Sequence, residues 1–277
     1  MYDSIPLSAL RPLEIEMLRS EIRENTTQRL NYTPAGVVLT VKTGDEWLKQ
    51  ECNTPMPKRL FGEFWYEHEL CVLFADTNMG KSMLAVQLAN SLARAERIEP
   101  FGLDMDRRQV VLYIDFELTA KQFEQRYRDP ATGNPHTFGA RFFRAEFNPM
   151  SELTPGFKDR EHQLNSAIES AINKTQATVL IIDNLTCLRS GTEKAADALP
   201  LMKHLKYLKA KFNLSILVLA HTPKRNPLKP ITRNDLQGSK MLINFCDSAF
   251  AIGESYQEKG LRYLKQIKQR NTHEVYV

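Results

Sequence analysis

Six short apolar runs, most of them separated by longer helical patterns, constrain the fold of this chain more than any other feature. The runs begin at residue 70, are rich in β-branched and aromatic residues, and read LCVLFA, VVLYIDF, RFFRAEF, TVLIID, SILVLA and SAFAIG. Such runs suit strands that are buried on both faces, as in parallel sheets covered by helices. We therefore expect an α/β fold with a mostly parallel central sheet covered by helices.

The two ends of the chain predict different elements. Residues 1–55 are expected to form an N-terminal helical extension and linker, with an amphipathic helix at 12–30 and a strand-like run at 36–41. Residues 56–277 are expected to form the α/β core. The last stretch, 260–277, predicts two strands around a turn at Asn271 that extend one edge of the sheet as an antiparallel hairpin.

Composition limits the cellular setting and indicates one class of partner. There is no apolar run of membrane-spanning length and no N-terminal apolar signal, and the four cysteines include no C-x-x-C pair, so we expect a cytoplasmic protein. The net charge is only +4, yet Lys203–Asn234 holds eight Lys or Arg and no acid. This basic stripe suggests contact with a polyanion, although such runs are as often solvated surface. The lysines at 203, 206 and 209 are expected to be solvated helix surface.

Residues 74–82, FADTNMGKS, predict a phosphate-binding loop between a strand and a helix. The pattern is A-x-x-x-x-G-K-S, in which Ala75 stands where Gly is usual, and its one methyl group is acceptable if φ stays negative. Lys81 is expected to reach the β- and γ-phosphates, and the Ser82 hydroxyl to bind Mg²⁺. The expected nucleotide contacts are Ala75, Asp76, Thr77, Asn78, Met79, Gly80, Lys81, Ser82 and Met83.

Acidic residues at the ends of two other strands complete a predicted hydrolytic site. Asp183 ends TVLIID, which is the Walker B pattern, and is expected to hold Mg²⁺. Glu117 follows VVLYIDF and is the predicted general base, with Asp115 as the second choice. Thr119 and the glutamine three residues later predict a capping box for the next helix, which leaves Glu117 available for chemistry.

His221 closes the strand SILVLA at the edge where ligands bind in open α/β sheets. A contact with the γ-phosphate is one interpretation. A purely structural histidine is as good an interpretation from the residue alone.

Six motifs in order give the chain a family resemblance: ADTNMGKS, IDFELTAKQFEQR, LIIDNL, LAHT, DLQGSKMLINFCDSAFAI and KQIKQRN. Residues 60–277 resemble RecA-fold ATPases of the hexameric helicase type, namely DnaB-type helicases and RepA-like plasmid helicases. The resemblance implies a RecA-like P-loop NTPase that uses ATP and Mg²⁺, forms a homo-oligomeric, hexameric ring and acts on single-stranded DNA. It implies that Glu117 activates water, that His221 senses the γ-phosphate, and that Lys268 and Arg270 reach into the neighbouring subunit's site.

The resemblance implies that two loops, one after the Walker B strand and one after the strand that ends at His221, line a central DNA channel. They are CLRSGTEKA and PKRNPLKPITRND. The second loop has no aromatic residue, so we expect backbone contact without sequence preference. The predicted nucleic-acid contacts are Lys224, Arg225, Lys229 and Arg233.

Two departures from the resemblance shape the functional hypothesis. Thr272 stands where replicative helicases usually have Gly, and only about 55 residues precede the core where those helicases carry a large primase-binding domain. We therefore expect an ATPase of a plasmid, phage or mobile element. Two alternatives stay open, a regulatory ATPase that gates assembly without unwinding and a small-molecule kinase. The choice between ATP and GTP also stays open.

Overall fold

The computed structural model describes residues 38–104, 107–185, 195–223, 226, 229–236, 240–258, 260–273 and 275. The chain divides into two units, 1–56 and 57–277. The predicted helix at 12–30 lies outside the described residues.

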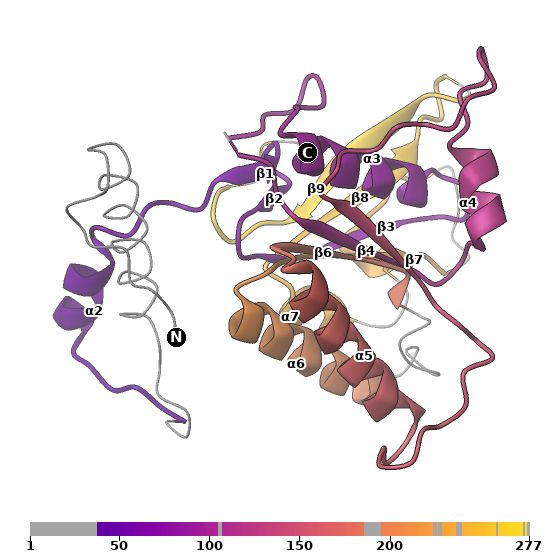
Figure 1. Cartoon of the computed structure of the whole chain (residues 1–277). Helices are drawn as coiled ribbons and strands as arrows, with labels where there is room; N and C mark the ends of the chain where they lie inside the picture. The colour runs from indigo at the N-terminus through magenta and orange to yellow at the C-terminus, as the bar shows by residue number, and fades with distance from the viewer. Residues whose placement is uncertain are drawn as a thin grey trace, which may run out of the picture. The chain divides into compact units, whose positions relative to one another are not determined.

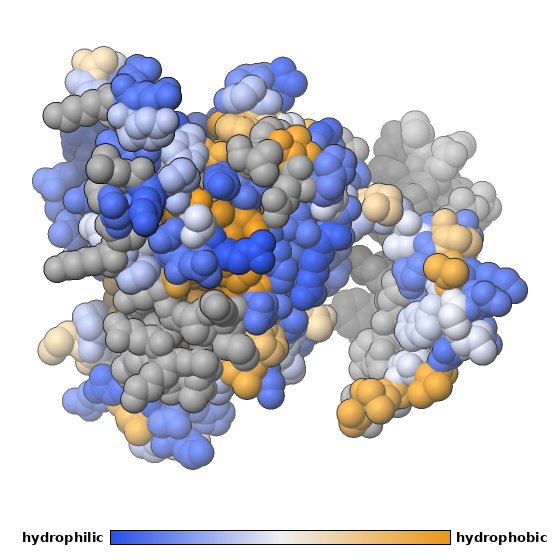
Figure 2. Space-filling view, turned by 180° about the vertical axis from the view of Figure 1, so that it is seen from behind, coloured by the Kyte–Doolittle hydropathy of each residue, from blue (hydrophilic) through white to orange (hydrophobic). Residues whose placement is uncertain are grey.

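The described part of the first unit holds one helix, α2 (Gly44–Glu51). Thr43 begins it with a capping box, because its side chain accepts from the Glu46 N–H while the Glu46 carboxylate accepts from the Thr43 N–H at 2.7 Å. The described part of the run at 36–41 is not a strand, and Val38, Leu39 and Val41 are exposed. Figure 2 shows hydrophobic atoms on the surface of this unit. The expectation of a strand there was wrong, because no neighbouring strand pairs with it in the described residues.

The second unit is built around a seven-stranded sheet with the order β5-β4-β6-β7-β3-β8-β9 (Figure 1). A separate pair, β1 and β2, precedes it. In chain order the elements of this unit are β1 (Arg59–Phe61), β2 (Trp65–Tyr66), β3 (Leu70–Ala75), α3 (Lys81–Arg94), β4 (Val111–Asp115), α4 (Ala120–Arg126), β5 (Phe142–Glu146), α5 (Arg160–Thr175), β6 (Val179–Asp183), α6 (Ala195–Phe212), β7 (Ser215–His221), the 3₁₀ turn η3 (Arg233–Asp235), α7 (Lys240–Phe245), β8 (Ser248–Glu254) and β9 (Arg262–Lys268).

Every pair in the large sheet is parallel except β8–β9, which is antiparallel. The parallel register aligns the strand ends, so that Ala75 lies opposite His221 and Asp115 lies opposite Asp183. The polar residues that follow β3, β4, β6 and β7 therefore meet at one edge of the sheet.

Two hydrophobic cores cover the two faces of the sheet. On one face, side chains such as Leu70, Val72 and Phe74 of β3 pack in a core with α5, α6 and α7. On the other face, Cys71 and Leu73 pack in a core with α3 and the β1–β2 pair. Figure 1 shows the helices arranged in these two layers. Because successive side chains of a strand point to opposite faces, a continuous apolar run serves both cores.

The predicted fold class is confirmed, including a C-terminal antiparallel pair, but the position of the hairpin differs from the prediction. The pair is β8–β9, and its turn is closed by the Ser255 N–H, which donates to the Leu261 carbonyl at 2.8 Å. No strand follows β9 among the described residues. Asn271 does not form the expected turn, because its side chain donates to the Glu69 carboxylate at 2.8 Å.

Among the described residues, none of the helices combines the length and the apolar character that a bilayer crossing requires.

Candidate active site

The phosphate-binding loop runs from the end of β3 to the start of α3, as predicted. Asn78 and Gly80 both have left-handed backbone conformations, with φ of 62° and 91°. Gly80 accepts this conformation without a side-chain clash. Ala75 has no positive φ, so the condition for its replacing Gly is met. The loop therefore leads through a left-handed glycine into the N-terminus of α3, and a helix N-terminus in this position suits an anion.

Lys81 begins α3 and turns back onto the loop. Its side chain is buried, and Nζ donates to the carbonyls of Ala75 at 2.8 Å and Asp76 at 2.9 Å. Burial lowers the pKa of the Lys81 ammonium, while the nearby carboxylates of Asp183, Glu117 and Asp76 act in the opposite direction. A buried cation whose hydrogen bonds within the described residues go to neutral carbonyls is suited to receive an anionic ligand.

Asp183 ends β6 at the same edge of the sheet and is buried. Burial raises the pKa of the Asp183 carboxyl, and hydrogen bonds from the Ser82 and Tyr113 hydroxyls partly offset this. The Tyr113 hydroxyl lies 2.5 Å from Asp183 Oδ2 and fixes that oxygen. Asp183 and Ser82, the two predicted Mg²⁺ ligands, are therefore in direct contact.

Glu117, Asn184 and His221 form a polar cluster where β4, β6 and β7 end. The Asn184 amide donates to the Glu117 carboxylate and lies 3.0 Å from His221 Nε2. His221 Nε2 is 3.5 Å from Glu117 Oε1. The His221 ring and the Asn184 amide hold the pKa of Glu117 below its usual value, so the carboxylate is ionised and oriented. His221 Nδ1 is buried without a hydrogen-bond partner in the described part of the chain, which leaves one polar atom for a ligand.

Asp115, the second choice for the base, has a structural task. Its carboxylate accepts from the N–H groups of Glu117 at 3.0 Å and Leu118 at 2.9 Å, and it pairs with Arg144 at 3.0 Å. Arg144 also donates to the Leu118 carbonyl. Asp115 and Arg144 therefore clamp the turn that carries Glu117. The capping box predicted after this turn, from Thr119 to Gln122, is confirmed.

A second polar link joins the loop to β7. The Thr222 hydroxyl donates to the Asp76 carboxylate, and the Thr222 N–H donates to the Ala75 carbonyl at 3.2 Å. The residue after His221 thus holds the start of the phosphate-binding loop.

These residues fit a nucleotide with Mg²⁺. The loop has a cation, a left-handed glycine and a helix N-terminus for phosphates, and Ser82 and Asp183 supply two oxygen ligands. The described residues contain no group of three or more His, Cys, Asp or Glu side chains that would hold a metal. Mg²⁺ in nucleotide sites commonly takes one or two protein ligands and completes its shell with phosphate and water.

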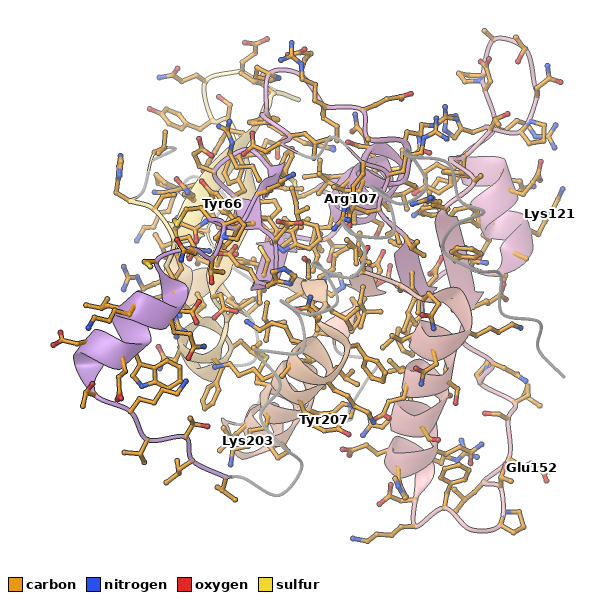
Figure 3. The ribbon with its side chains drawn as sticks, turned by 60° about the vertical axis from the view of Figure 1, so that its left-hand side comes forward. Tyr66, Arg107, Lys121, Glu152, Lys203 and Tyr207 are labelled. Atoms are coloured by element: carbon orange, nitrogen blue, oxygen red, sulfur yellow. The ribbon has the colours of Figure 1, made fainter. Side chains whose placement is uncertain are left out.

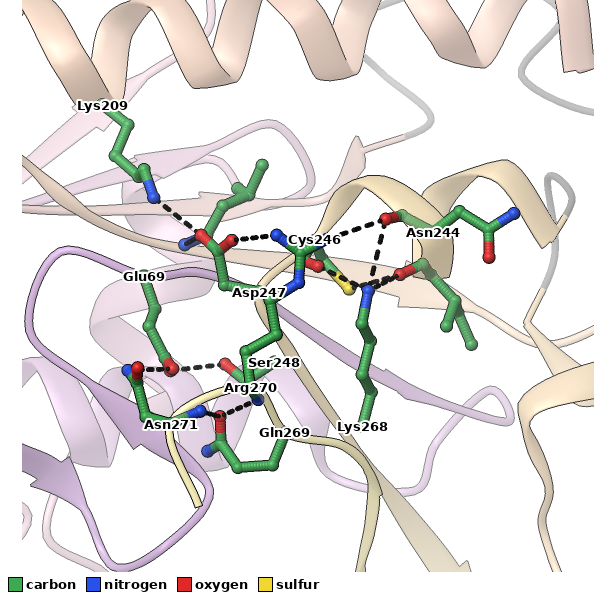
Figure 4. A network of polar contacts seen from close by, with 12 residues as sticks. Glu69, Lys209, Asn244, Cys246, Asp247, Ser248, Lys268, Gln269, Arg270 and Asn271 are labelled. Atoms are coloured by element: carbon green, nitrogen blue, oxygen red, sulfur yellow. Dashed lines mark hydrogen bonds and ion pairs between the residues drawn. The ribbon is translucent and has the colours of Figure 1, made fainter. Parts of the chain in front are cut away.

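Lys268 ends β9 and Arg270 follows it, at the end of the strand that is remote from the loop. Figure 4 shows the polar network around these two residues. β9 runs from Arg262, beside the loop, to Lys268, which places Lys268 about 20 Å from the loop of its own chain. Lys268 Nζ donates to three carbonyls at the end of α7, those of Ile243, Asn244 and Cys246. A cation at a helix C-terminus stabilises the helix, so Lys268 has a structural role in the single chain.

Arg270 is half exposed and pairs with Asp247, Nη1 to Oδ1, at 3.2 Å. Asp247 also pairs with Lys209 at 2.7 Å. Figure 4 shows Asp247 between these two cations. Neither Lys268 nor Arg270 lies near the loop of its own chain, so their proposed role in a neighbouring subunit stays a prediction.

Part of the predicted basic surface lies outside the described residues, namely Lys224 and Arg225. Lys229 and Arg233 are exposed in the connection between β7 and α7. On α6, Lys203 is exposed and projects outward together with Tyr207 (Figure 3). Lys209 was expected to be solvated surface, and this was wrong because the lysine forms the ion pair with Asp247.

Sequence reasoning missed several residues that the structure brings to the site. Asn184 directly follows the Walker B aspartate, and a polar residue in that position was the available signal. Tyr113 and Arg144 act through contacts 70 and 29 residues away, which no local pattern reveals. Arg262 reaches the loop across 184 residues.

Comparison with known proteins supports the nucleotide site. A family model described as an AAA domain matches residues 38–227, more than half of the chain. The match includes the phosphate-binding loop, Glu117, Asp183 and His221, and ends before β8. No curated protein matches the chain. With the loop, the Walker B carboxylate and the model match in agreement, the chain belongs to the AAA domain family of P-loop ATPases.

Proposed function

We propose that this chain hydrolyses ATP in a homo-oligomeric, hexameric ring that moves on single-stranded DNA, as a helicase-type ATPase of a plasmid, phage or mobile element. One observation carries ATP hydrolysis, the central part of the proposal: Lys81, Ser82, Asp183, Glu117 and His221 come from four neighbouring strands and meet at one edge of the sheet. A phosphate-binding loop alone would suit many nucleotide-binding proteins. The oriented carboxylate beside it favours hydrolysis.

Each side chain has a task in this proposal. Lys81 would leave the loop carbonyls and bind phosphate oxygens, and Ser82 and Asp183 would hold Mg²⁺. Mg²⁺ held by these residues would supply positive charge close to the phosphoryl group. Glu117 orients a water molecule and accepts its proton, and Asn184 and His221 hold the carboxylate in place.

The assembly part of the proposal rests on Arg270. Its guanidinium is half exposed and lies at the edge of the sheet remote from its own loop. An arginine in this place cannot serve its own site, but it can serve the site of an adjoining copy. Arginines that one protein supplies to the nucleotide site of another raise the rate of nucleotide hydrolysis by orders of magnitude.

The DNA part rests on the basic connection after β7, of which Lys229 and Arg233 are exposed. Positive side chains on an exposed connection suit a phosphate backbone. The cytoplasmic location stays a prediction.

A regulatory ATPase with slow turnover is the second candidate, and Lys268 favours it. Its ammonium is satisfied by three carbonyls of its own chain, so reaching another subunit would cost those hydrogen bonds. An ATPase in which assembly must first release this lysine would turn over slowly until a partner or DNA binds.

The test is the rate of ATP hydrolysis at several protein concentrations, with and without single-stranded DNA at low salt. Our proposal predicts stimulation by DNA and a rate per subunit that rises with concentration. Arg270→Ala should abolish most of the rate, and mixing it with Lys81→Ala should restore part of it, because each variant supplies what the other lacks. Arg233→Ala should weaken the DNA effect alone. Turnover that ignores DNA would favour the regulatory candidate, and a rate that survives Arg270→Ala would exclude the assembly role.

A further inference from the structure

Arg262 is the first residue of β9, and it stands at the edge of the sheet where the phosphate-binding loop lies. β9 pairs with β8, and β8 pairs with β3, which leads into the loop. Arg262 is thus on the same chain as the loop and only two strands away. It also lies beyond the part of the chain that the family model matches.

The guanidinium of Arg262 rests on the loop itself. Nη2 donates to the Asn78 carbonyl at 3.3 Å. A Cβ atom on Gly80 would lie 2.9 Å from Nη1, so a side chain at that position would push the guanidinium away. The cross-strand neighbour of Arg262 is Glu254, an acidic residue at the end of β8. Although this carboxylate lies on the neighbouring strand, the guanidinium of Arg262 donates to the loop.

Two cations of this chain therefore donate to carbonyls of the same loop. Lys81, at the start of α3, donates to the carbonyls of Ala75 and Asp76. Arg262, at the start of β9, donates to the carbonyl of Asn78. A backbone carbonyl is a neutral acceptor, whereas a phosphate is charged and accepts two parallel bonds from a guanidinium. A phosphorylated ligand in the loop offers the better partner to both cations.

We propose that Arg262 is a nucleotide-binding residue that contributes from its own chain, and that it exchanges its bond to Asn78 for one to a phosphate of the bound nucleotide. This inference deepens the proposed function and rests on it. Arg262 opens the strand that Lys268 closes, so the exchange would act on the strand that carries the predicted partner contacts. The exposed position of Arg262 leaves its guanidinium room to move.

Equilibrium binding of ATP, ADP and adenosine, without turnover, tests this inference. The variants are Arg262→Ala, Arg262→Lys and Lys265→Ala, and Lys81→Ala serves as the reference for loss of phosphate binding. Lys265 is the matched control, because it lies on β9 three residues further on and faces the other side of the strand. Thermal unfolding of each variant without nucleotide reports whether the fold is kept.

We expect Arg262→Ala to weaken ATP and ADP binding by roughly tenfold to a hundredfold, with adenosine unaffected. Arg262→Lys should restore part of the affinity, and Lys265→Ala should bind as the unaltered chain does. The salt dependence of ATP binding should become shallower in Arg262→Ala.

Normal ATP and ADP binding by Arg262→Ala, beside a clear loss in Lys81→Ala, would overturn this inference and leave the proposed function standing. An equal loss for adenosine would also overturn it, since the guanidinium would then contact the base. If Lys81→Ala bound ATP normally, the proposed function would fail and this inference with it.

Discussion

Replacing Arg144 by methionine should destabilise the protein and release the turn that carries Glu117. The Arg144 and Asp115 side chains are 14% and 1% exposed, so the variant leaves a buried carboxylate without its cation. Breaking such a pair from one side typically costs about 3–5 kcal/mol. Asp115 keeps two backbone N–H donors, at 3.0 and 2.9 Å, so we expect the lower end of this range. About 3 kcal/mol corresponds to a melting temperature lower by roughly 6–12 °C for a unit of this size.

Thermal unfolding followed by circular dichroism measures this effect. Arg128→Met is the matched control, because it removes the same side chain from an exposed pair with Glu124, and such pairs contribute at most about 1 kcal/mol. The hydrolysis rate of Arg144→Met should fall as well, at a temperature where the variant is folded. A melting temperature no lower than that of Arg128→Met would refute the reasoning, because the Arg144–Asp115 pair would then contribute no more than an exposed one.

Three further outcomes follow from other polar contacts of the structure. Glu117→Gln should lower the hydrolysis rate by roughly 10²- to 10⁴-fold with nucleotide affinity kept, as single-turnover and binding measurements can show. Tyr113→Phe removes the hydroxyl that holds Asp183 at 2.5 Å, and should weaken Mg²⁺-dependent nucleotide binding by roughly tenfold or more while Mg²⁺-independent binding stays unchanged. Burial acts to raise the pKa of Asp247, but the Leu70 N–H and the Lys209 ammonium outweigh it and lower that pKa below 3.8. Its stabilising effect is therefore present above pH 3.8 and lost as the pH falls through the lowered pKa, so Asp247→Asn should be less stable at pH 7 and the difference should shrink in acid.

Much of the core fold was predictable, because its determinants are local in the sequence. Strands buried on both faces require continuous apolar runs, and β3, β4 and β6 are such runs. The phosphate-binding loop has a fixed spacing from Ala75 to Ser82, and a capping box needs only two residues three positions apart. Asp183 and Glu117 were found because parallel strands deliver their last residues to one edge.

The supporting contacts of the site were not predictable, because they depend on register and on distant pairs. The sequence offered Asp115 as a second candidate base. In the structure its carboxylate is held by two backbone N–H donors and by Arg144, contacts that the sequence does not show. The prediction of a turn at Asn271 was wrong, because the sequence does not distinguish a turn asparagine from one that donates to a distant carboxylate. α2 was missed, although Thr43 and Glu46 carry the spacing of a capping box.

The most direct test of the central claim is phosphate release from ATP by the unaltered chain, Lys81→Ala and Glu117→Gln, with ATP binding measured on the same samples. We expect Mg²⁺-dependent hydrolysis that both variants lose, with ATP binding lost in Lys81→Ala and kept in Glu117→Gln. Hydrolysis that persists in Glu117→Gln at the unaltered rate would contradict the account, because the cluster of Glu117, Asn184 and His221 would then have no part in the chemistry.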